Sequence, residues 1–225
     1  MTDNQASQPQ PLPPHEQLVQ MAMAHWVSQI TYVAARLNLA DHLAAGPLTA
    51  DDLAKLTSTH PPSLYRLLRT LASLGIVCEQ DSRHFSLTPL GVALKTGAPG
   101  SARASVLTLA SDWWMRGFGQ LLYSVQTGKS GFEKHLGMPI FDWLAQHPEQ
   151  ASMFSETMVG FHGSEPAALV AAYDFSALNT IVDVGGATGH LLCTILASHP
   201  ACGGILFDLP HVVRDAPPLI EARGL

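Results

Sequence analysis

The chain has 225 residues, of which 47% are hydrophobic and 13% charged, and its formal net charge is −6. This composition suffices for a folded core in one or two domains, and the acidic balance argues against a general attraction to nucleic acid. Three cysteines without Cys-x-x-Cys spacing and eleven histidines without ligand spacing predict neither a disulfide framework nor a metal site.

The chain opens on a polar, proline-rich stretch, and we expect residues 1–14 to form a disordered arm. This stretch lacks the basic and apolar segments of a signal peptide. No apolar run in the chain reaches the roughly 18 residues of a membrane-spanning helix. Together with the cysteine pattern, these features predict a cytoplasmic protein without membrane contact.

Residues 15–100 are predicted to form a mainly helical winged-helix domain. Its first helix, over residues 18–45, carries apolar side chains every three or four positions and few charges. A helix this apolar must bury more than one face. In a small domain, that predicts contact with a partner subunit.

Residues that typically start or end helices indicate the other elements of this domain. Thr49 followed by Asp52 is a variant of the capping box, which starts a helix. Pro61 suits the first turn of another helix, and Gly75 ends it. The resulting order of helix, turn, helix and wing has helices over 50–56 and 63–74, and strands over 76–78 and 85–87.

A winged helix admits a second function, that of a DNA-binding regulator. The helix over residues 63–74 would then be the recognition helix, and its only positive side chains are Arg66 and Arg69. Residues 1–100 hold six Lys or Arg and seven Asp or Glu, so this half lacks the basic face that groove readers show. The composition disfavours DNA binding, which stays an alternative.

Residues 101–175 are predicted to be a helical connector between two domains. Helices are expected from residue 139 and over 149–173, with a glycine-rich loop over 128–137. Aromatic side chains at helical spacing are more often core than ligand pocket. Met158 is open to either use, because methionine adapts to irregular surfaces.

Residues 176–225 begin with the strand, glycine turn and helix of a nucleotide-binding unit. The mostly apolar residues 181–184 predict a buried strand. A second strand, over 204–207, ends in Asp208, nineteen positions after Gly189. At this position such folds place a carboxylate that accepts hydrogen bonds from ribose hydroxyls.

The glycine turn excludes the commoner nucleotide motifs. Both registers of G-x-G-x-x-G fail here, and no lysine follows Gly189 as a phosphate-binding P-loop requires. The pattern that fits is acid-x-Gly-x-x-x-Gly, formed by Asp183, Gly185 and Gly189. The same pattern also occurs in turns that bind no ligand. The spacing between Gly189 and Asp208 disfavours that alternative.

The residues Val-Asp-Val-Gly-Gly-Ala-Thr-Gly at 182–189 resemble a motif of the S-adenosylmethionine-dependent O-methyltransferases that modify small hydroxylated molecules. Phe-Asp-Leu-Pro at 207–210 is similar to the end of that family's second strand. The one departure is Ala187 in place of the middle glycine, a mild change while its φ stays negative. The resemblance extends over residues 18–225.

The resemblance implies a winged-helix dimerisation domain followed by the first part of an α/β Rossmann-like methyltransferase domain. It implies a homodimer, S-adenosylmethionine as cofactor, and a small, aromatic or polyketide-like hydroxylated acceptor. The cofactor-binding residues would be Asp183, Gly185, Gly186, Gly189, Asp208, Leu209 and Met158. The acceptor-binding residues would be Trp113, Trp114, Phe154, Met158, Phe161 and His162.

The general base of the resembling family comes from a later part of the nucleotide-binding domain, beyond the position of Leu225. We therefore assign no catalytic residue, and expect a truncated chain that is inactive alone. A non-catalytic dimerisation fragment remains a third interpretation, beside the methyltransferase and the DNA-binding regulator.

Overall fold

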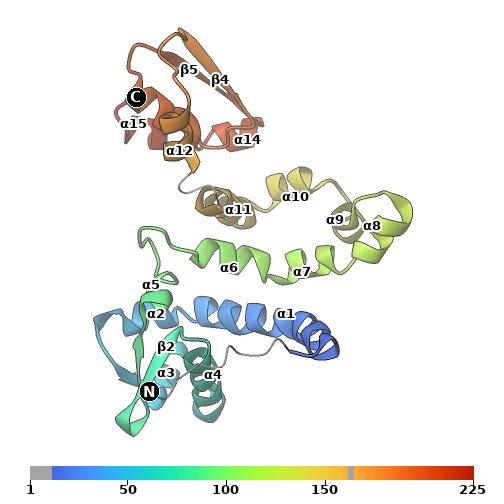
Figure 1. Ribbon diagram of the computed structural model, residues 1–225, viewed down its shortest axis with the longest axis vertical. Coiled ribbons are helices and arrows are strands. Elements are labelled where there is room, and N and C mark those ends of the chain that lie inside the picture. Colours follow the sequence, from blue (N-terminus) through green and yellow to red (C-terminus); the bar gives the residue numbers. More distant parts are fainter. Residues whose placement is uncertain (1–11, 162–164) are drawn as a thin grey trace, which may run out of the picture.

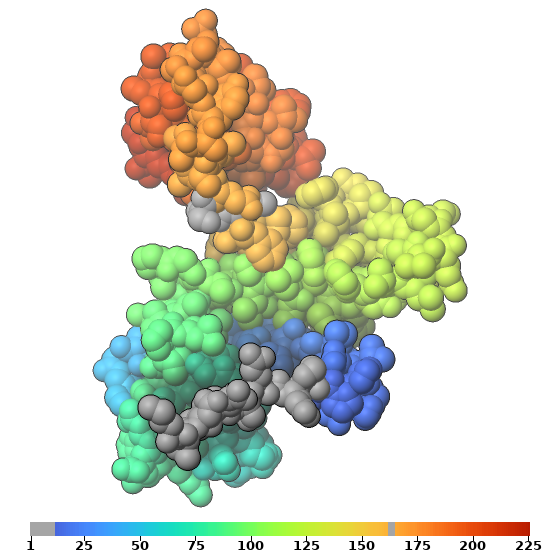
Figure 2. Space-filling model, in the orientation of Figure 1, coloured from blue at the N-terminus to red at the C-terminus, as the bar shows by residue number. Residues whose placement is uncertain are grey.

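The computed structural model describes residues 12–161 and 165–225. The N-terminal helices and the C-terminal strands lie at opposite ends of an elongated molecule, with a layer of short helices between them (Figure 1). The space-filling view shows the same three-part division on the surface (Figure 2). Of the predicted arm, residues 1–11 lie outside the described residues, and the first helix already begins at Pro14.

The single helix predicted over residues 18–45 is interrupted. Helix α1 spans Pro14–Arg36, α2 spans Leu39–His42, and a 3-10 turn, η1, covers Leu43–Ala45. The break is at Asn38, whose φ of 51° is left-handed and cannot continue a right-handed helix. Apolar periodicity runs across the break because both segments pack on one core.

The outward face of α1 is apolar and exposed. Leu18, Met21 and Trp26 are 67%, 70% and 56% exposed, whereas Ala34 and Ala35 near the other end are buried. The described chain therefore leaves one apolar face of α1 uncovered, in the place where the sequence predicts a partner.

The winged-helix order predicted from the sequence is present. Its elements are β1 (Leu48–Thr49), α3 (Ala50–Thr57), α4 (Pro61–Ser73), β2 (Val77–Gln80), the 3-10 turn η2 (Asp81–Arg83) and β3 (His84–Leu87). The Thr49 side chain accepts a hydrogen bond from the Asp52 backbone N–H at 3.1 Å, as the capping pattern predicts. Strand β3 lies between β1 and β2 in an antiparallel sheet, with Phe85 fully buried. The two-residue strand β1 was not predicted.

The middle layer consists of short helices. They are α6 (Arg103–Leu109), α7 (Asp112–Phe118), α8 (Leu121–Thr127), α9 (Gly131–Leu136), α10 (Ile140–Gln146) and α11 (Pro148–Phe161), whereas α5 (Pro89–Val92) packs on β3 in the N-terminal part (Figure 1). The loop predicted over residues 128–137 is wrong, because it contains α9. Left-handed Gly128 and Gly137 end α8 and α9, and the Ser130 side chain caps α9 by accepting from the Glu133 N–H at 3.2 Å.

The C-terminal part follows strand–helix–strand order. Its elements are α12 (Glu165–Ala172), β4 (Thr180–Val184), α13 (His190–Ser198), β5 (Gly203–Phe207), α14 (Pro210–Val213) and α15 (Pro217–Glu221). Strands β4 and β5 are parallel, with Val184 opposite Phe207. Helix α13 packs closely on Gly204, where a Cβ atom would clash with Leu192 and Leu196.

The prediction that strand 181–184 is buried is wrong for alternate residues. One face of the sheet meets α13, but Val182 and Val184 are 55% and 74% exposed, and Ile205 and Phe207 beside them are similarly open. Successive strand residues point to opposite faces, and no described element covers this second face. The sheet therefore presents an apolar surface to solvent.

Candidate functional site

A cleft of about 950 Å³ lies between the helices of the middle layer and the C-terminal unit. Side chains of α10, α11 and α12 form one wall, and the turn after β4 together with the end of β5 forms the other. Its lining includes Phe141, Phe154, Met158, Leu169, Asp183, Gly185, Gly186, Ala187, His190, Asp208, Leu209 and His211. Six of the seven residues predicted to bind the cofactor thus meet at one cleft.

The glycine turn has the backbone geometry that its sequence indicates. Gly185 and Gly189 have φ values of 76° and 83°, which L-residues rarely adopt. At Gly186, a Cβ atom would overlap the carboxylate of Asp183 and the side chain of Leu206. Gly189 is buried at the start of α13, outside the lining of the cleft.

The backbone of Ala187 differs from the sequence-based expectation. Its φ is 51°, so this alanine takes a left-handed conformation rather than the negative φ expected. Such a conformation costs an L-residue on the order of 1 kcal/mol relative to glycine. One compensating contact is visible, because the Ala187 N–H donates to Asp208 Oδ2 at 2.8 Å.

Asp208 is held at the carboxyl end of β5, facing the glycine turn. Its Oδ1 accepts from the Leu209 N–H at 2.7 Å, and its Oδ2 accepts from Ala187. Each carboxylate oxygen can accept a further hydrogen bond. The carboxylate is therefore oriented by two backbone donors and keeps capacity for a ligand hydroxyl.

Asp183 is the least satisfied polar group of the cleft. Its Oδ2 is buried and has no hydrogen-bond partner among the described residues. Burial, helped by the negative charge of Asp208, raises the pKa of Asp183 above the ordinary range of an aspartate. A positive charge bound in the cleft would favour the ionised form of Asp183.

His190 starts α13 and lines the cleft. The Arg223 guanidinium lies 2.6 Å from His190 Nδ1 and donates to its carbonyl oxygen at 3.2 Å. Burial first, and then the charge of Arg223, lowers the pKa of His190. Because arginine only donates, Nδ1 acts as the acceptor, which makes His190 neutral with its proton on Nε2.

The structure separates the residues predicted to bind the acceptor. Phe154 lines the cleft together with Met158, whereas Trp113 and Trp114 lie in an aromatic cluster outside its lining. Trp114 reaches the cleft indirectly, with its ring centroid 6.2 Å from that of Phe154. Phe161 is 52% exposed and outside the lining, and His162 lies outside the described residues.

Several lining residues were not predicted. Ala151, Ser155 and Val159 share the face of α11 that carries Phe154 and Met158, and helical spacing from Met158 could have indicated them. Glu165 and His211 also line the cleft. They come from other elements, and no local pattern links them to it.

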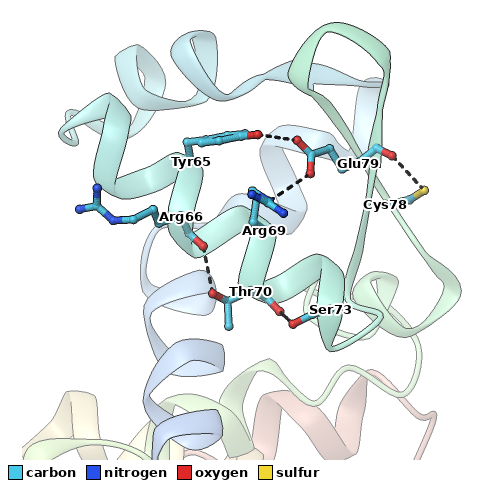
Figure 3. Close-up of polar contacts among 7 residues, drawn as sticks. All are labelled: Tyr65, Arg66, Arg69, Thr70, Ser73, Cys78 and Glu79. Carbon is cyan, nitrogen blue, oxygen red and sulfur yellow. Dashed lines mark hydrogen bonds and ion pairs between the residues drawn. The ribbon is translucent and has the colours of Figure 1, made fainter.

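The face that a DNA-binding protein would use carries a carboxylate. Glu79 on β2 accepts from the Tyr65 hydroxyl at 2.9 Å and lies 3.7 Å from Arg69 Nε (Figure 3). Arg66 donates to Ser63 Oγ at 3.2 Å. The positive charge of Arg69 on α4 is thus offset within the chain, which weakens the case for phosphate binding.

None of the described helices has both the length and the apolar content that a transmembrane segment needs. Within residues 12–161 and 165–225, no three His, Cys, Asp or Glu side chains are grouped as a metal site would require.

Two protein-family models match successive parts of the chain. An O-methyltransferase dimerisation domain matches residues 19–97, and an O-methyltransferase domain matches residues 118–224. The chain is 39% identical over 225 residues to the phenazine O-methyltransferase PhzM of Lysobacter antibioticus. This match covers all of this chain and 65% of the length of that relative. The chain thus spans somewhat less than two thirds of the length of that relative.

Solved structures agree in fold. The crystal structure of LaPhzM superposes with a TM-score of 0.89 at 39% identity, over 95% of this chain and 64% of that one. The O-methyltransferase NcsB1 of neocarzinostatin biosynthesis, in complex with S-adenosylmethionine and 2-hydroxy-5-methyl naphthoic acid, gives 0.75 at 30% identity, over 88% and 62%. The two domain matches and the likeness to these relatives show that this chain belongs to the O-methyltransferase family.

Proposed function

We propose that the protein takes part in the transfer of a methyl group from S-adenosylmethionine to a hydroxyl of a small aromatic molecule. The observation that carries this proposal is the meeting of Asp183, the glycine turn and Asp208 with the apolar face of α11 at one cleft. A cofactor at the turn and an acceptor against Phe154 and Met158 would then be neighbours.

The residues present fit this cofactor. The negative charge of Asp183 beside the cleft suits the ammonium end, the side-chain-free Gly185 and Gly186 allow close approach of the backbone, and Asp208 suits ribose hydroxyls. When bound, the sulfonium supplies an activated methyl group. The role of this chain is to hold the two reactants in line and to exclude water between them.

We assign no general base to this chain. The chain spans 65% of the length of the phenazine O-methyltransferase PhzM of Lysobacter antibioticus. Activity of the 225 residues alone is therefore not part of the proposal. The division into residues 15–100, 101–175 and 176–225, dimerisation through the first of these, and a cytoplasmic location remain predictions.

The first test is calorimetric titration of the chain with S-adenosylhomocysteine, with a nicotinamide dinucleotide as control. We expect selective binding of S-adenosylhomocysteine. Substitution Asp208→Ala should weaken it by at least about tenfold, because a charge-assisted hydrogen bond is lost. The matched control is Asp215→Ala, since Asp215 is an exposed carboxylate beside Arg214.

Unchanged affinity in Asp208→Ala would refute the ribose assignment. Binding of neither nucleotide, by a chain shown to be folded, would argue for the dimerisation-fragment interpretation. A salt-dependent shift of a DNA duplex would instead favour the regulator.

A further inference from the structure

We infer that His190 binds the carboxylate at the amino-acid end of S-adenosylmethionine through its Nε2–H, and that Arg223 is the positioning residue that holds the imidazole ring for this contact. The inference rests on the proposed function and deepens its cofactor site. It concerns the first turn of α13, directly after the glycine turn, and the segment that follows α15.

The Arg223 guanidinium contacts His190 at two points. Its Nη1 donates to the His190 carbonyl oxygen at 3.2 Å, and its Nη2 lies 2.6 Å from Nδ1 of the ring. The two residues are 33 positions apart, so the contact joins the segment after α15 to the start of α13. A planar guanidinium that donates to both the backbone and the ring of one residue holds the two in a fixed relation. Arg223 therefore sets the orientation of the imidazole.

The ring keeps one free polar edge. Because Nδ1 accepts from the arginine, the proton of the neutral imidazole is on Nε2. Among the described residues, Arg103 Nε and Asp183 Oδ2 are the only buried side-chain nitrogen or oxygen atoms without a partner. No group in the described ranges bonds His190 Nε2, so this atom is open to solvent. His190 lines the cleft and Arg223 does not, which makes the Nε2 edge the one available to a ligand.

The position of Asp183 indicates which part of the cofactor meets this edge. The Asp183 carboxylate packs against Gly186 of the turn. Burial raises the pKa of Asp183, and a hydrogen bond from the Leu192 backbone N–H, in the first turn of α13, partly offsets this. The carboxylate therefore lies beside the start of the helix that His190 opens. In S-adenosylmethionine the ammonium and the carboxylate share one carbon atom, so an ammonium bound at Asp183 brings the carboxylate next to His190.

The contact with Arg223 also strengthens the donor. Asp183 and Asp208 are two acids beside the glycine turn, and a ligand carboxylate near them is unfavourable unless it is hydrogen-bonded. A positive group that donates to Nδ1 draws electron density from the ring, which makes Nε2–H a better donor. His190 is thus suited to accept an anionic group without itself carrying a charge.

The experiment compares S-adenosylhomocysteine with its decarboxylated analogue, S-adenosyl-3-thiopropylamine, by calorimetric titration. The analogue keeps the ammonium group and the nucleoside and lacks only the carboxylate. We expect His190→Leu to weaken S-adenosylhomocysteine by about tenfold and the analogue by less than about twofold. His190→Gln keeps a side-chain N–H and should retain most of the affinity. Asp208→Ala is the control that should weaken both ligands alike, because both contain the ribose.

The role of Arg223 is tested with the same ligand. Arg223→Met should weaken S-adenosylhomocysteine by about fivefold, and Arg223→Lys nearly as much, since lysine keeps the charge and loses the two-point contact. In the His190→Leu background, Arg223→Met should have no further effect. The matched control is Arg214→Met, on an exposed arginine beside Asp215, and it should leave the affinity unchanged. Nitrogen-15 NMR of the His190 ring should show the proton on Nε2 in the unchanged chain and a mixture of tautomers in Arg223→Met.

Three outcomes would overturn the inference. Equal loss of both ligands in His190→Leu, or no loss of either, would contradict the contact with the carboxylate. A full effect of Arg223→Met in the His190→Leu background would show that Arg223 acts by its charge and not through the ring. In both cases S-adenosylhomocysteine still binds and the proposed function stands. If S-adenosylhomocysteine does not bind the unchanged chain, the proposed function fails first and this inference fails with it.

Discussion

At the scale of single residues, the turn after β4 combines a conformational cost with a well-placed hydrogen bond. Ala187 holds a left-handed backbone, and its N–H orients the Asp208 carboxylate. Glycine at this position would keep the N–H and remove the cost of the methyl group. The departure from the family motif should therefore be visible as a loss of stability.

Substitution Ala187→Gly is expected to increase the free energy of unfolding by about 0.5–1 kcal/mol, measured by urea denaturation. The control Ala168→Gly, at an exposed position inside α12, should lower it by about 1 kcal/mol, because glycine is a poor helix former. A loss of stability in both variants would contradict the left-handed conformation at Ala187.

Asp183 makes a prediction for pH dependence. Its pKa is raised in the folded chain, so folding favours its protonated form. The stabilising contribution is complete below the unfolded pKa of about 3.9 and is lost as pH rises through the folded pKa. Asp183 therefore lowers stability towards neutral pH.

Variant Asp183→Asn should remove this dependence. Relative to the unchanged chain, we expect it to gain stability on going from about pH 4 to pH 7, as followed by urea denaturation at several pH values. The exposed Asp215→Asn serves as the control and should show no such trend. If the stability of Asp183→Asn relative to the unchanged chain fell as pH rises, the pKa of Asp183 would be lowered by folding and not raised.

At the scale of elements, the cleft wall depends on how α11 is seated on α6. Thr157 on α11 is fully buried, with its Oγ1 2.9 Å from Thr108 Oγ1 of α6 and 2.8 Å from the Met153 carbonyl oxygen. Thr157 lies between Phe154 and Met158 in the chain and faces away from the cleft. This buried polar contact fixes which face of α11 is turned to the ligand side.

Substitution Thr157→Val should lower the free energy of unfolding by about 1 kcal/mol, because the buried Thr108 hydroxyl loses the donor at 2.9 Å and keeps only its 3.4 Å bond to the Met153 carbonyl oxygen. Thr127→Val is the matched control: Thr127 donates to the Tyr123 carbonyl oxygen in the same helical manner, on an exposed helix. Its effect should stay within about 0.5 kcal/mol. Equal effects of the two variants would show that the contact with Thr108 adds nothing.

At the scale of the whole molecule, two apolar surfaces lie at opposite ends of the chain. One is the outward face of α1, and the other is the open face of β4 and β5. Exposed apolar areas of this kind mark surfaces that other protein segments cover. The dimerisation-domain match over residues 19–97 includes most of α1 and neither β4 nor β5.

Dimerisation should therefore depend on α1. Met21→Glu is expected to weaken a homodimer by at least about tenfold in sedimentation experiments, since a charge would be buried at the contact. Val184→Glu places the same charge on the equally exposed sheet face and should leave the dimer intact. If only Val184→Glu lost the dimer, the interface would lie on the open face of β4 and β5 and not on α1.

Signals that act within a few residues were read correctly from the sequence. The Thr49 cap, the order of strand, glycine turn and helix, and the acid at the end of β5 are present as predicted, although Ala187 in the turn is left-handed and one face of the strand is exposed. Each depends on backbone preferences or hydrogen bonds between near neighbours. Local chemistry therefore determined the order of the elements and the position of the candidate cofactor site.

Contacts between distant segments decided the rest. The two-residue strand β1 exists only through its pairing with β3, and Ala187 holds its left-handed φ beside a carboxylate 21 residues away. The tryptophans of α7 and Phe154 of α11 all lie on helices, yet only Phe154 lines the cleft. The sequence by itself determined the family and the polar groups at the strand ends. Only the tertiary structure decided which helical faces meet those groups, because the direction of a face is set by packing across the chain and not by its own periodicity.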